Sequence, residues 1–230
     1  MPPTWLTVVS WCALALGLAS AAYIVVDITV RRFRQPMWIM EVVWPVSGLY
    51  FLMVAVWGYH RYGRPMSTRW QVEHTRPEPP PKPWWATVAV GVSHCGAGCT
   101  LGDIVAEFTV FALGATIAGE MIFAMFVGDY LAAVALGIVF QYFAIAPMRG
   151  LGLAHGLREA AKADVLSLTA FEVGLFSWMA LTHYVFFPAP HLDPSSPVYW
   201  FLMQVGMVIG FFTAWPANVW LIKAGIKEAM

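Results

Sequence analysis

Residues 84–113 have the sequence WWATVAVGVSHCGAGCTLGDIVAEFTVFAL, and this stretch decides the fold class of the chain. As a helix that rises about 1.5 Å per residue, it is longer than the hydrocarbon core of a bilayer, which is about 30 Å thick. Its apolar residues form continuous runs and do not alternate with polar residues as they do in the strands of a membrane barrel. The stretch therefore predicts a membrane-spanning α-helix.

The whole chain has the composition of a membrane protein. Of its 230 residues, 60% are hydrophobic and 11% are charged, and the mean hydropathy is +0.66. Soluble domains carry about 45–50% apolar and about 25% charged residues, which excludes a soluble globular protein. The apolar composition makes the lipid bilayer the expected partner. Because the 13 Lys+Arg and the 13 Asp+Glu cancel, we expect no nucleic acid.

Five other apolar stretches are also long enough to cross a bilayer. We therefore expect one integral membrane domain, residues 1–230, that folds as an all-α polytopic transmembrane helical bundle of about six spans. The junction between the third and fourth spans lacks a strongly polar loop, so we expect the chain to make a tight turn or a re-entrant break at this point. The six predicted spans are residues 4–30, 37–60, 84–113, 119–148, 164–187 and 199–222.

The longest polar segment, residues 61–83, contains five prolines in its last seven residues and predicts a stiff Pro-rich cytoplasmic linker between the second and third spans. With six spans, ten of the Lys and Arg residues fall on one side of the membrane, and only Arg31, Arg32 and Arg34 fall on the other. Because basic residues concentrate on the cytoplasmic side, we expect both termini in the cytoplasm. The ten residues on that side are Arg61, Arg64, Arg69, Arg76, Lys82, Arg149, Arg158, Lys162, Lys223 and Lys227.

The third predicted span carries the densest group of reactive side chains. Cys95, Cys99, Asp103 and Glu107 recur every four residues, and His94 precedes them. On a helix this spacing places the four side chains on one face. Carboxylates within a span are costly, about 2.5–3.5 kcal/mol each on insertion scales, so they point to a functional site.

Two polar residues of other spans are expected at a similar depth in the membrane. If Trp84 marks the cytoplasmic interface, Cys95 lies about 16 Å inward, Glu172 about 12 Å and Gln141 about 10 Å. We therefore predict one polar chamber in the cytoplasmic half of the bilayer, to which Thr169 and Asn218 add hydrogen-bonding groups. By contrast, His183 and His191 lie near the outer face and are not assigned to this site.

Thiolates and imidazole suit soft transition metals, while carboxylates accept harder ions or protons. Our first hypothesis is a site for a soft metal ion, copper before zinc, in a transporter, metal handler or sensor rather than an enzyme. Cys95, Cys99 and His94 would be its ligands, with Asp103, Glu107 and Glu172 as a relay for the ion or for protons.

Two alternatives stay open. In the first, a redox membrane protein uses a Cys95/Cys99 dithiol or a haem held by His94 and another histidine; an i, i+4 cysteine pair is close to the distance limit for a disulfide. In the second, the protein is a non-catalytic scaffold whose Gly and Cys stripe only packs helices. A homo-oligomer is compatible with each hypothesis.

Four segments of the chain resemble a bacterial multi-pass membrane family described as a domain of unknown function. The likeness extends from about Trp38 onward. It implies a bacterial inner-membrane protein and carries over no catalytic residue, because the family has no established activity. The segments are SHCGAGCTLGD at 93–103, QYFAIAPMRG at 141–150, LSLTAFEVG at 166–174 and WPANVWLI at 215–222.

Overall fold

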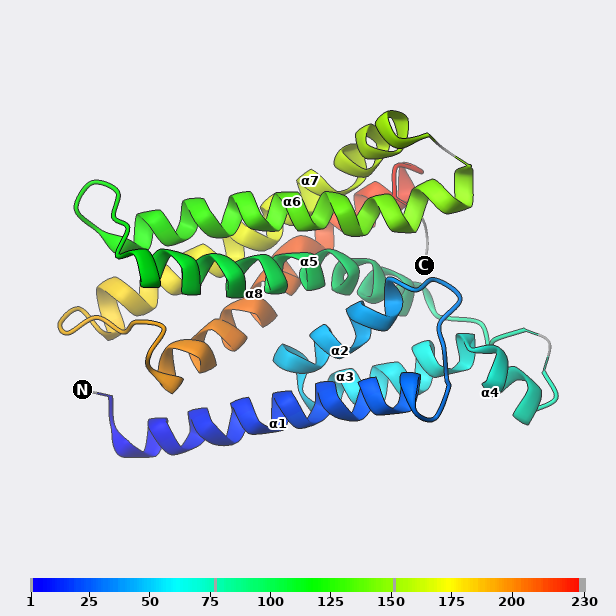
Figure 1. The fold of residues 1–230 in the computed structure, drawn as a ribbon, viewed down its shortest axis with the longest axis horizontal. Helices are drawn as coiled ribbons and strands as arrows, with labels where there is room; N and C mark the ends of the chain where they lie inside the picture. Colours follow the sequence, from blue (N-terminus) through cyan, green and yellow to red (C-terminus); the bar gives the residue numbers. More distant parts are fainter. Residues whose placement is uncertain (1, 77, 151, 228–230) are drawn as a thin grey trace.

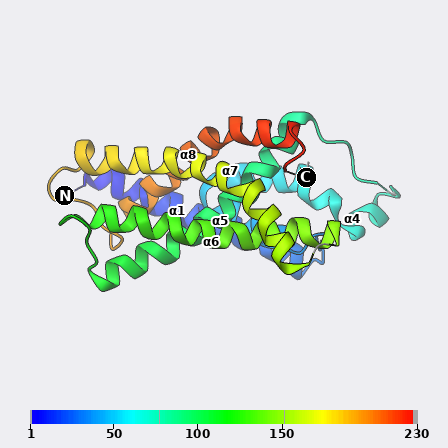
Figure 2. The same ribbon diagram turned by 90° about the horizontal axis from the view of Figure 1, so that it is seen from above.

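The computed structural model describes residues 2–76, 78–150 and 152–227, and it is helical throughout these parts apart from turns and loops. The long helices lie side by side along one axis (Figures 1 and 2), which confirms the predicted all-α bundle. They are α1 (Thr4–Thr29), α5 (Trp84–Leu113), α6 (Met121–Arg149), α7 (Leu153–Leu181) and α8 (Pro197–Lys223).

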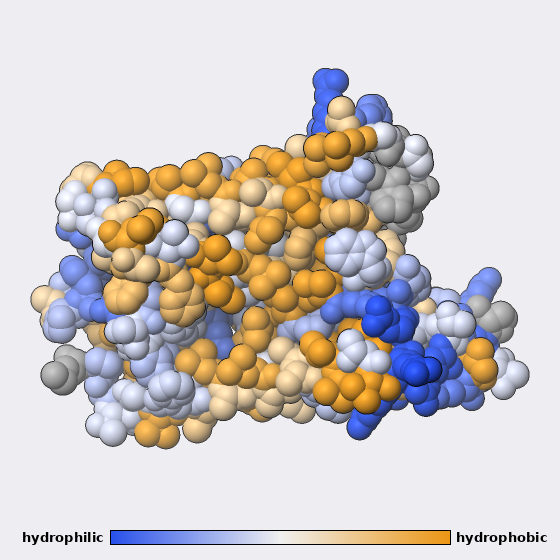
Figure 3. All heavy atoms as spheres, in the orientation of Figure 1, coloured by the Kyte–Doolittle hydropathy of each residue, from blue (hydrophilic) through white to orange (hydrophobic). Residues whose placement is uncertain are grey.

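Five of the helices are long and apolar enough to cross a membrane: those that begin at Thr4, Trp84, Met121, Leu153 and Pro197. Figure 3 shows hydrophobic surface along the length of the bundle, with hydrophilic surface gathered at the end where α3 and α4 lie. Large apolar side chains such as Leu18, Leu131 and Phe212 are exposed on these helices, each more than 60%. A soluble protein does not expose a continuous apolar surface of this extent, so the chain is an integral membrane protein.

The predicted span at residues 37–60 is not one helix. It forms α2 (Met40–Phe51) and α3 (Met53–Gly58), followed by the π-turn η1 (Tyr59–Gly63) and the 3₁₀ turn η2 (Arg64–Met66). Leu52 separates α2 from α3 with a φ of 53°, a conformation that no α-helix tolerates. A 12-residue helix such as α2 is about 18 Å long and cannot cross the bilayer.

The contacts of this segment show that it enters the bundle and returns to the same end. Trp38 packs on Phe143 near the end of α6, and Trp57 stacks on Trp85 at the start of α5. Between these two points, the Leu49 carbonyl reaches the middle of the bundle, where it accepts a hydrogen bond of 2.6 Å from Gln204 Nε2. The segment is therefore a re-entrant helix pair. The Gln204 side chain donates a hydrogen bond to a carbonyl beside the break. Backbone polar groups at the depth of the hydrocarbon core need such a partner, because lipid offers none.

This re-entrant pair changes the predicted sidedness. The N-terminal end of the described chain lies at one end of the bundle and the C-terminal end at the other (Figure 1). The expectation that both termini lie on one side required residues 37–60 to cross the membrane. In the structure this segment enters the bundle and returns to the same end. The side of the membrane that each end of the chain faces stays a prediction.

The same change gathers the basic residues at one end. Arg69 donates a hydrogen bond to the Arg31 carbonyl, and Arg64 pairs with Asp27 at the end of α1, 3.3 Å away. The segment at residues 31–34 therefore lies beside the linker region rather than across the membrane from it. Within that linker, α4 (Thr68–Glu73) is helical, and Pro83 begins α5. The end of α6, the start of α7 and the end of α8, which carry further basic residues, lie at the same end of the bundle (Figure 1).

Helices α5 and α6 pack closely because small residues face each other. A Cβ atom on Gly102 would lie 2.6 Å from the Ala133 backbone nitrogen, and one on Gly98 would lie 3.1 Å from Gly137 Cα. The glycines of the third span therefore allow close packing in a continuous helix, and they do not unwind it. Gly114, at φ +59°, ends α5, and a tight turn leads into α6.

Candidate functional site

The core of the bundle encloses a row of buried polar side chains. Cys95, Cys99 and Asp103 on α5 are fully buried, and Glu107 is 2% exposed. They follow one another along the inner face of α5, as their spacing predicted, over about 18 Å of helix. Helices α7 and α8, which pack on each other and on α5, close this interior.

An ion pair closes the row at its basic end. The chain turns back after α8 through Gly225, which has a φ of +67°. Lys227 is thereby buried, and its Nζ lies 3.3 Å from Asp164 Oδ1 on α7. The Asp164 carboxyl also interacts with the Cys95 thiol. The sequence placed Lys227 in the cytoplasm, but the structure places its ammonium group inside the bundle.

In the middle of the row, carboxyl groups of three helices approach one another. The Glu172 carboxyl of α7 lies near the Cys99 thiol. Asp103 on α5 is close enough to Glu172, Glu107 and Asp129 to interact electrostatically with each of them. Asp129, on α6, is 1% exposed. It belongs to this group.

Tyr199 links the row to the opposite end of the bundle. Its side chain lies beside Glu107 and Asp129, and its hydroxyl donates a hydrogen bond of 3.6 Å to Met125 Sδ. Tyr199 and Met125 also line a pocket at the end of the bundle far from the basic residues. No pattern in the sequence singled out Tyr199, because an aromatic residue near a span end is usually an interface anchor.

We call Asp103, Glu107, Asp129 and Glu172 the acidic column. Both carboxylate oxygens of Asp103 and of Glu172 are buried without a hydrogen-bond partner, as is one oxygen each of Glu107 and Asp129. Among the residues that the structure describes, none of the four forms an ion pair with Lys, Arg or His. Buried polar atoms are normally satisfied, so a column of unsatisfied carboxylates indicates a place for protons, water or cations.

The other predicted site residues lie at the edges of this column. His94 packs edge-on against Phe140, with ring centroids 6.2 Å apart, and neither ring nitrogen has a partner. Gln141 is buried, and both polar atoms of its side chain are unpartnered. Thr169 instead contacts the Tyr130 hydroxyl at 3.0 Å, and Asn218 donates a hydrogen bond of 2.6 Å to Ser167. These two side chains therefore stabilise helix contacts.

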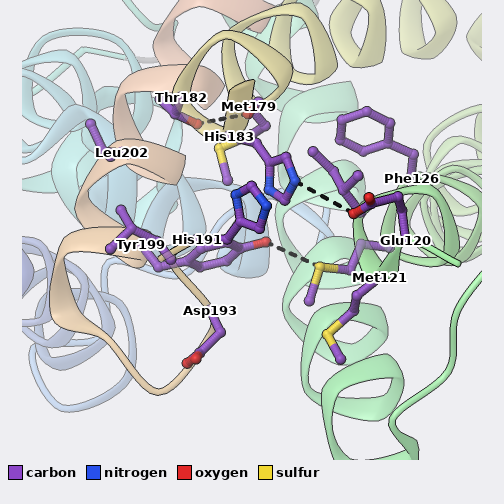
Figure 4. A pocket seen from close by; sticks show the side chains of 13 residues that line it. Glu120, Met121, Phe126, Met179, Thr182, His183, His191, Asp193, Tyr199 and Leu202 are labelled. Carbon is purple, nitrogen blue, oxygen red and sulfur yellow. Dashed lines mark hydrogen bonds and ion pairs between the residues drawn. The ribbon is translucent and has the colours of Figure 1, made fainter. Parts of the chain in front are cut away.

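The predicted metal ligands do not converge on one point. In the described parts of the chain, one set of three His, Cys, Asp or Glu residues has its ligand atoms within 4.8 Å of one another, and it is Glu120, His183 and His191. Figure 4 shows the two imidazoles facing Glu120 in the pocket that Tyr199 and Met125 also line. Sequence reasoning missed this set because its members come from separate segments, more than 60 residues apart at the extremes.

The comparisons with known proteins place the chain in a family but give it no activity. A family model for a domain of unknown function, DUF4396, matches residues 84–227. The chain therefore belongs to this family, and the match includes α5 to α8 with the whole acidic column. Searches of curated proteins and of solved structures found no match.

Proposed function

We propose that this protein moves a cation through the bilayer along the acidic column. The observation that carries the proposal is that four buried carboxyl groups from three helices face one another without a basic partner. Carboxyl groups at membrane depth are costly unless protons or cations occupy the site. Together with Cys95 and Cys99 on α5, these carboxyl groups offer a series of steps from the pocket at one end to the Lys227–Asp164 pair at the other.

A soft transition-metal ion, copper before zinc, is the cargo we propose. Cys99 and Glu172 form a pair of ligands on the path, and Cys95 lies one turn further along α5. Pairs of ligands hold an ion more weakly than closed sets of three or four, which suits an ion that must leave each site. Protons displaced from the thiols and carboxyl groups would travel on the same column.

The proposed location is the bacterial inner membrane. The segments that carry the basic residues lie together at one end of the bundle (Figure 1), and basic residues concentrate on the cytoplasmic side of a membrane. Under this proposal the start of α1 and the pocket at that end face the outside, and the end of α8 faces the cytoplasm. Fusion of a fluorescent protein that matures only in the cytoplasm should give signal at the C-terminal end and none at the N-terminal end. Signal from both fusions would refute this orientation.

Transport is tested with the full chain in liposomes that contain a pH-sensitive dye and, separately, a metal indicator. We compare Glu172→Gln with Glu73→Gln, which removes a carboxyl group from the exposed helix α4. A barrier change of about 1.4 kcal/mol alters a rate tenfold, so we expect Glu172→Gln to slow flux at least about tenfold. The Glu73 variant should conduct like the wild type.

Each outcome of this experiment decides between the hypotheses. Loss of metal flux but not of proton flux in Cys95→Ser/Cys99→Ser would support a soft metal that passes the thiols. Absence of any proton, copper or zinc flux above empty liposomes would refute the proposal, as would unchanged flux in Glu172→Gln. A thiol count that changes with redox conditions, or a haem absorbance, would favour the redox alternative instead, and an inert colourless protein the scaffold.

A further inference from the structure

The pocket at the outer end of the bundle has the side chains of a metal site. Its cavity is about 200 Å³, and three segments converge on it: the start of α6, the π-turn η3 (Thr182–Phe186) and the loop that follows. Glu120 supplies a carboxylate, and His183 and His191 supply imidazoles, with all three ligand atoms within 4.8 Å of one another. Met121 and Met179 also line this cavity.

The distances in this pocket are close to those of a coordinated ion. His183 Nε2 lies 3.9 Å from Glu120 Oε2, too far for a hydrogen bond. Two ligand atoms about 2.1 Å from a tetrahedral ion are about 3.4 Å apart, so a shift of roughly 0.5 Å would let both coordinate it. The Glu120 side chain is 46% exposed and the His183 side chain is 13% exposed, which leaves the carboxylate free to move.

His191 is also oriented as a metal ligand usually is. His191 Nδ1 lies 3.1 Å from the Phe187 carbonyl, so this nitrogen donates its proton and leaves Nε2 with a free lone pair. Metal-bound histidines typically make such a hydrogen bond with their second nitrogen. The rings of His183 and His191 stack at a centroid distance of 3.7 Å (Figure 4), an arrangement that two imidazolium cations would oppose.

We propose that Glu120, His183 and His191 bind a divalent transition-metal ion of the zinc class at the outer mouth of the acidic column. Two imidazoles and one carboxylate form a common catalytic or exchangeable zinc set, which leaves the fourth position open to water or to another ligand. Because Tyr199 and Met125 line the same pocket and continue toward Glu107, the site lies where an ion would enter the column. Binding here does not depend on whether the column conducts.

The test measures zinc binding to the purified full chain in detergent micelles after removal of metals with a chelator. Wild-type protein should bind one zinc ion per chain in calorimetry, and Co²⁺ as a spectroscopic probe should give d–d absorbance bands. His183→Gln/His191→Gln should weaken binding at least about 100-fold, since it removes two direct ligands. His155→Gln, a substitution at an exposed histidine near the start of α7, is the matched control.

Two further variants keep the result decisive. Glu120→Gln is a milder change at a half-exposed side chain, and it should weaken binding and alter the Co²⁺ bands even if the double histidine variant does not fold. Cys95→Ser/Cys99→Ser should bind zinc as the wild type does, even if it fails in transport. The proposal is overturned if the wild type binds no zinc, if the Glu120 variant binds normally, or if binding is lost in the cysteine variant.

Discussion

Replacing Lys227 by methionine should destabilise the bundle strongly, because it leaves the buried Asp164 without its cation. The two charged groups are 3.3 Å apart, and their side chains are 0% and 1% exposed. With an effective dielectric constant of about 20, opposite unit charges at this distance attract by about 5 kcal/mol. Removal of one partner from a buried pair commonly costs about 3–5 kcal/mol. We therefore expect Lys227→Met to lower the free energy of unfolding by about 3–5 kcal/mol.

The measurement is unfolding in mixed micelles titrated with a denaturing detergent and followed by far-UV circular dichroism. Lys223→Met is the control, because Lys223 is an exposed residue at the end of α8, four residues before Lys227, and should change stability by less than about 0.5 kcal/mol. The double variant Lys227→Met/Asp164→Asn removes both charges and should recover most of the loss, because a neutral side chain at Asp164 no longer needs a cation.

Two results would refute this reasoning. If Lys227→Met unfolds within about 0.5 kcal/mol of the wild type, a difference typical of surface substitutions, the ion pair does not hold the end of α8 against α7. If Asp164→Asn lowers stability further in the background of Lys227→Met, the two residues are not energetically coupled as a pair. In either case the basic end of the column would not be closed by these residues.

Two other substitutions test the packing that forms the bundle. Gly102→Val should lower the free energy of unfolding by at least about 2 kcal/mol, because its side chain would collide with the Ala133 backbone only 2.6 Å from the Cβ position. Gly152→Ala has no neighbour within 4 Å and should change stability by less than about 0.5 kcal/mol, so equal effects at the two glycines would contradict close α5–α6 packing. Gln204→Leu should cost about 1–3 kcal/mol by the same assay, because the Leu49 carbonyl loses its 2.6 Å hydrogen bond; an unchanged stability would show that water or another group satisfies it.

Hydropathy located the long helices well because the signal is local. A span such as Trp84–Leu113 is recognised from its own residues, since its length and apolar content alone meet the requirement of the bilayer. The four-residue spacing on α5 was equally readable, because a continuous helix places residues Cys95, Cys99, Asp103 and Glu107 on one face whatever surrounds it. Their burial in the bundle follows that pattern.

Residues 37–60 show where local reasoning fails. Their apolar content is sufficient for a span, but content does not reveal whether the chain crosses the membrane or turns back at Leu52. That choice depends on distant partners: Gln204 for a freed carbonyl, and Trp85 for the returning segment. The sidedness of the chain depended on this single crossing, and a hydropathy profile contains no information about it.

From the sequence alone it follows that the chain is an integral membrane protein, that its membrane-spanning segments are helices, and that acidic groups lie within these helices. Which of these groups lie close to one another depends on the tertiary structure. Glu120, His183 and His191 come together at one end, and Asp164 finds Lys227 at the other, because loops and helix ends fold back onto the bundle. Transfer into lipid is a property of each segment, whereas a site requires side chains from separate segments to approach within a few ångströms, and this distance is set by packing.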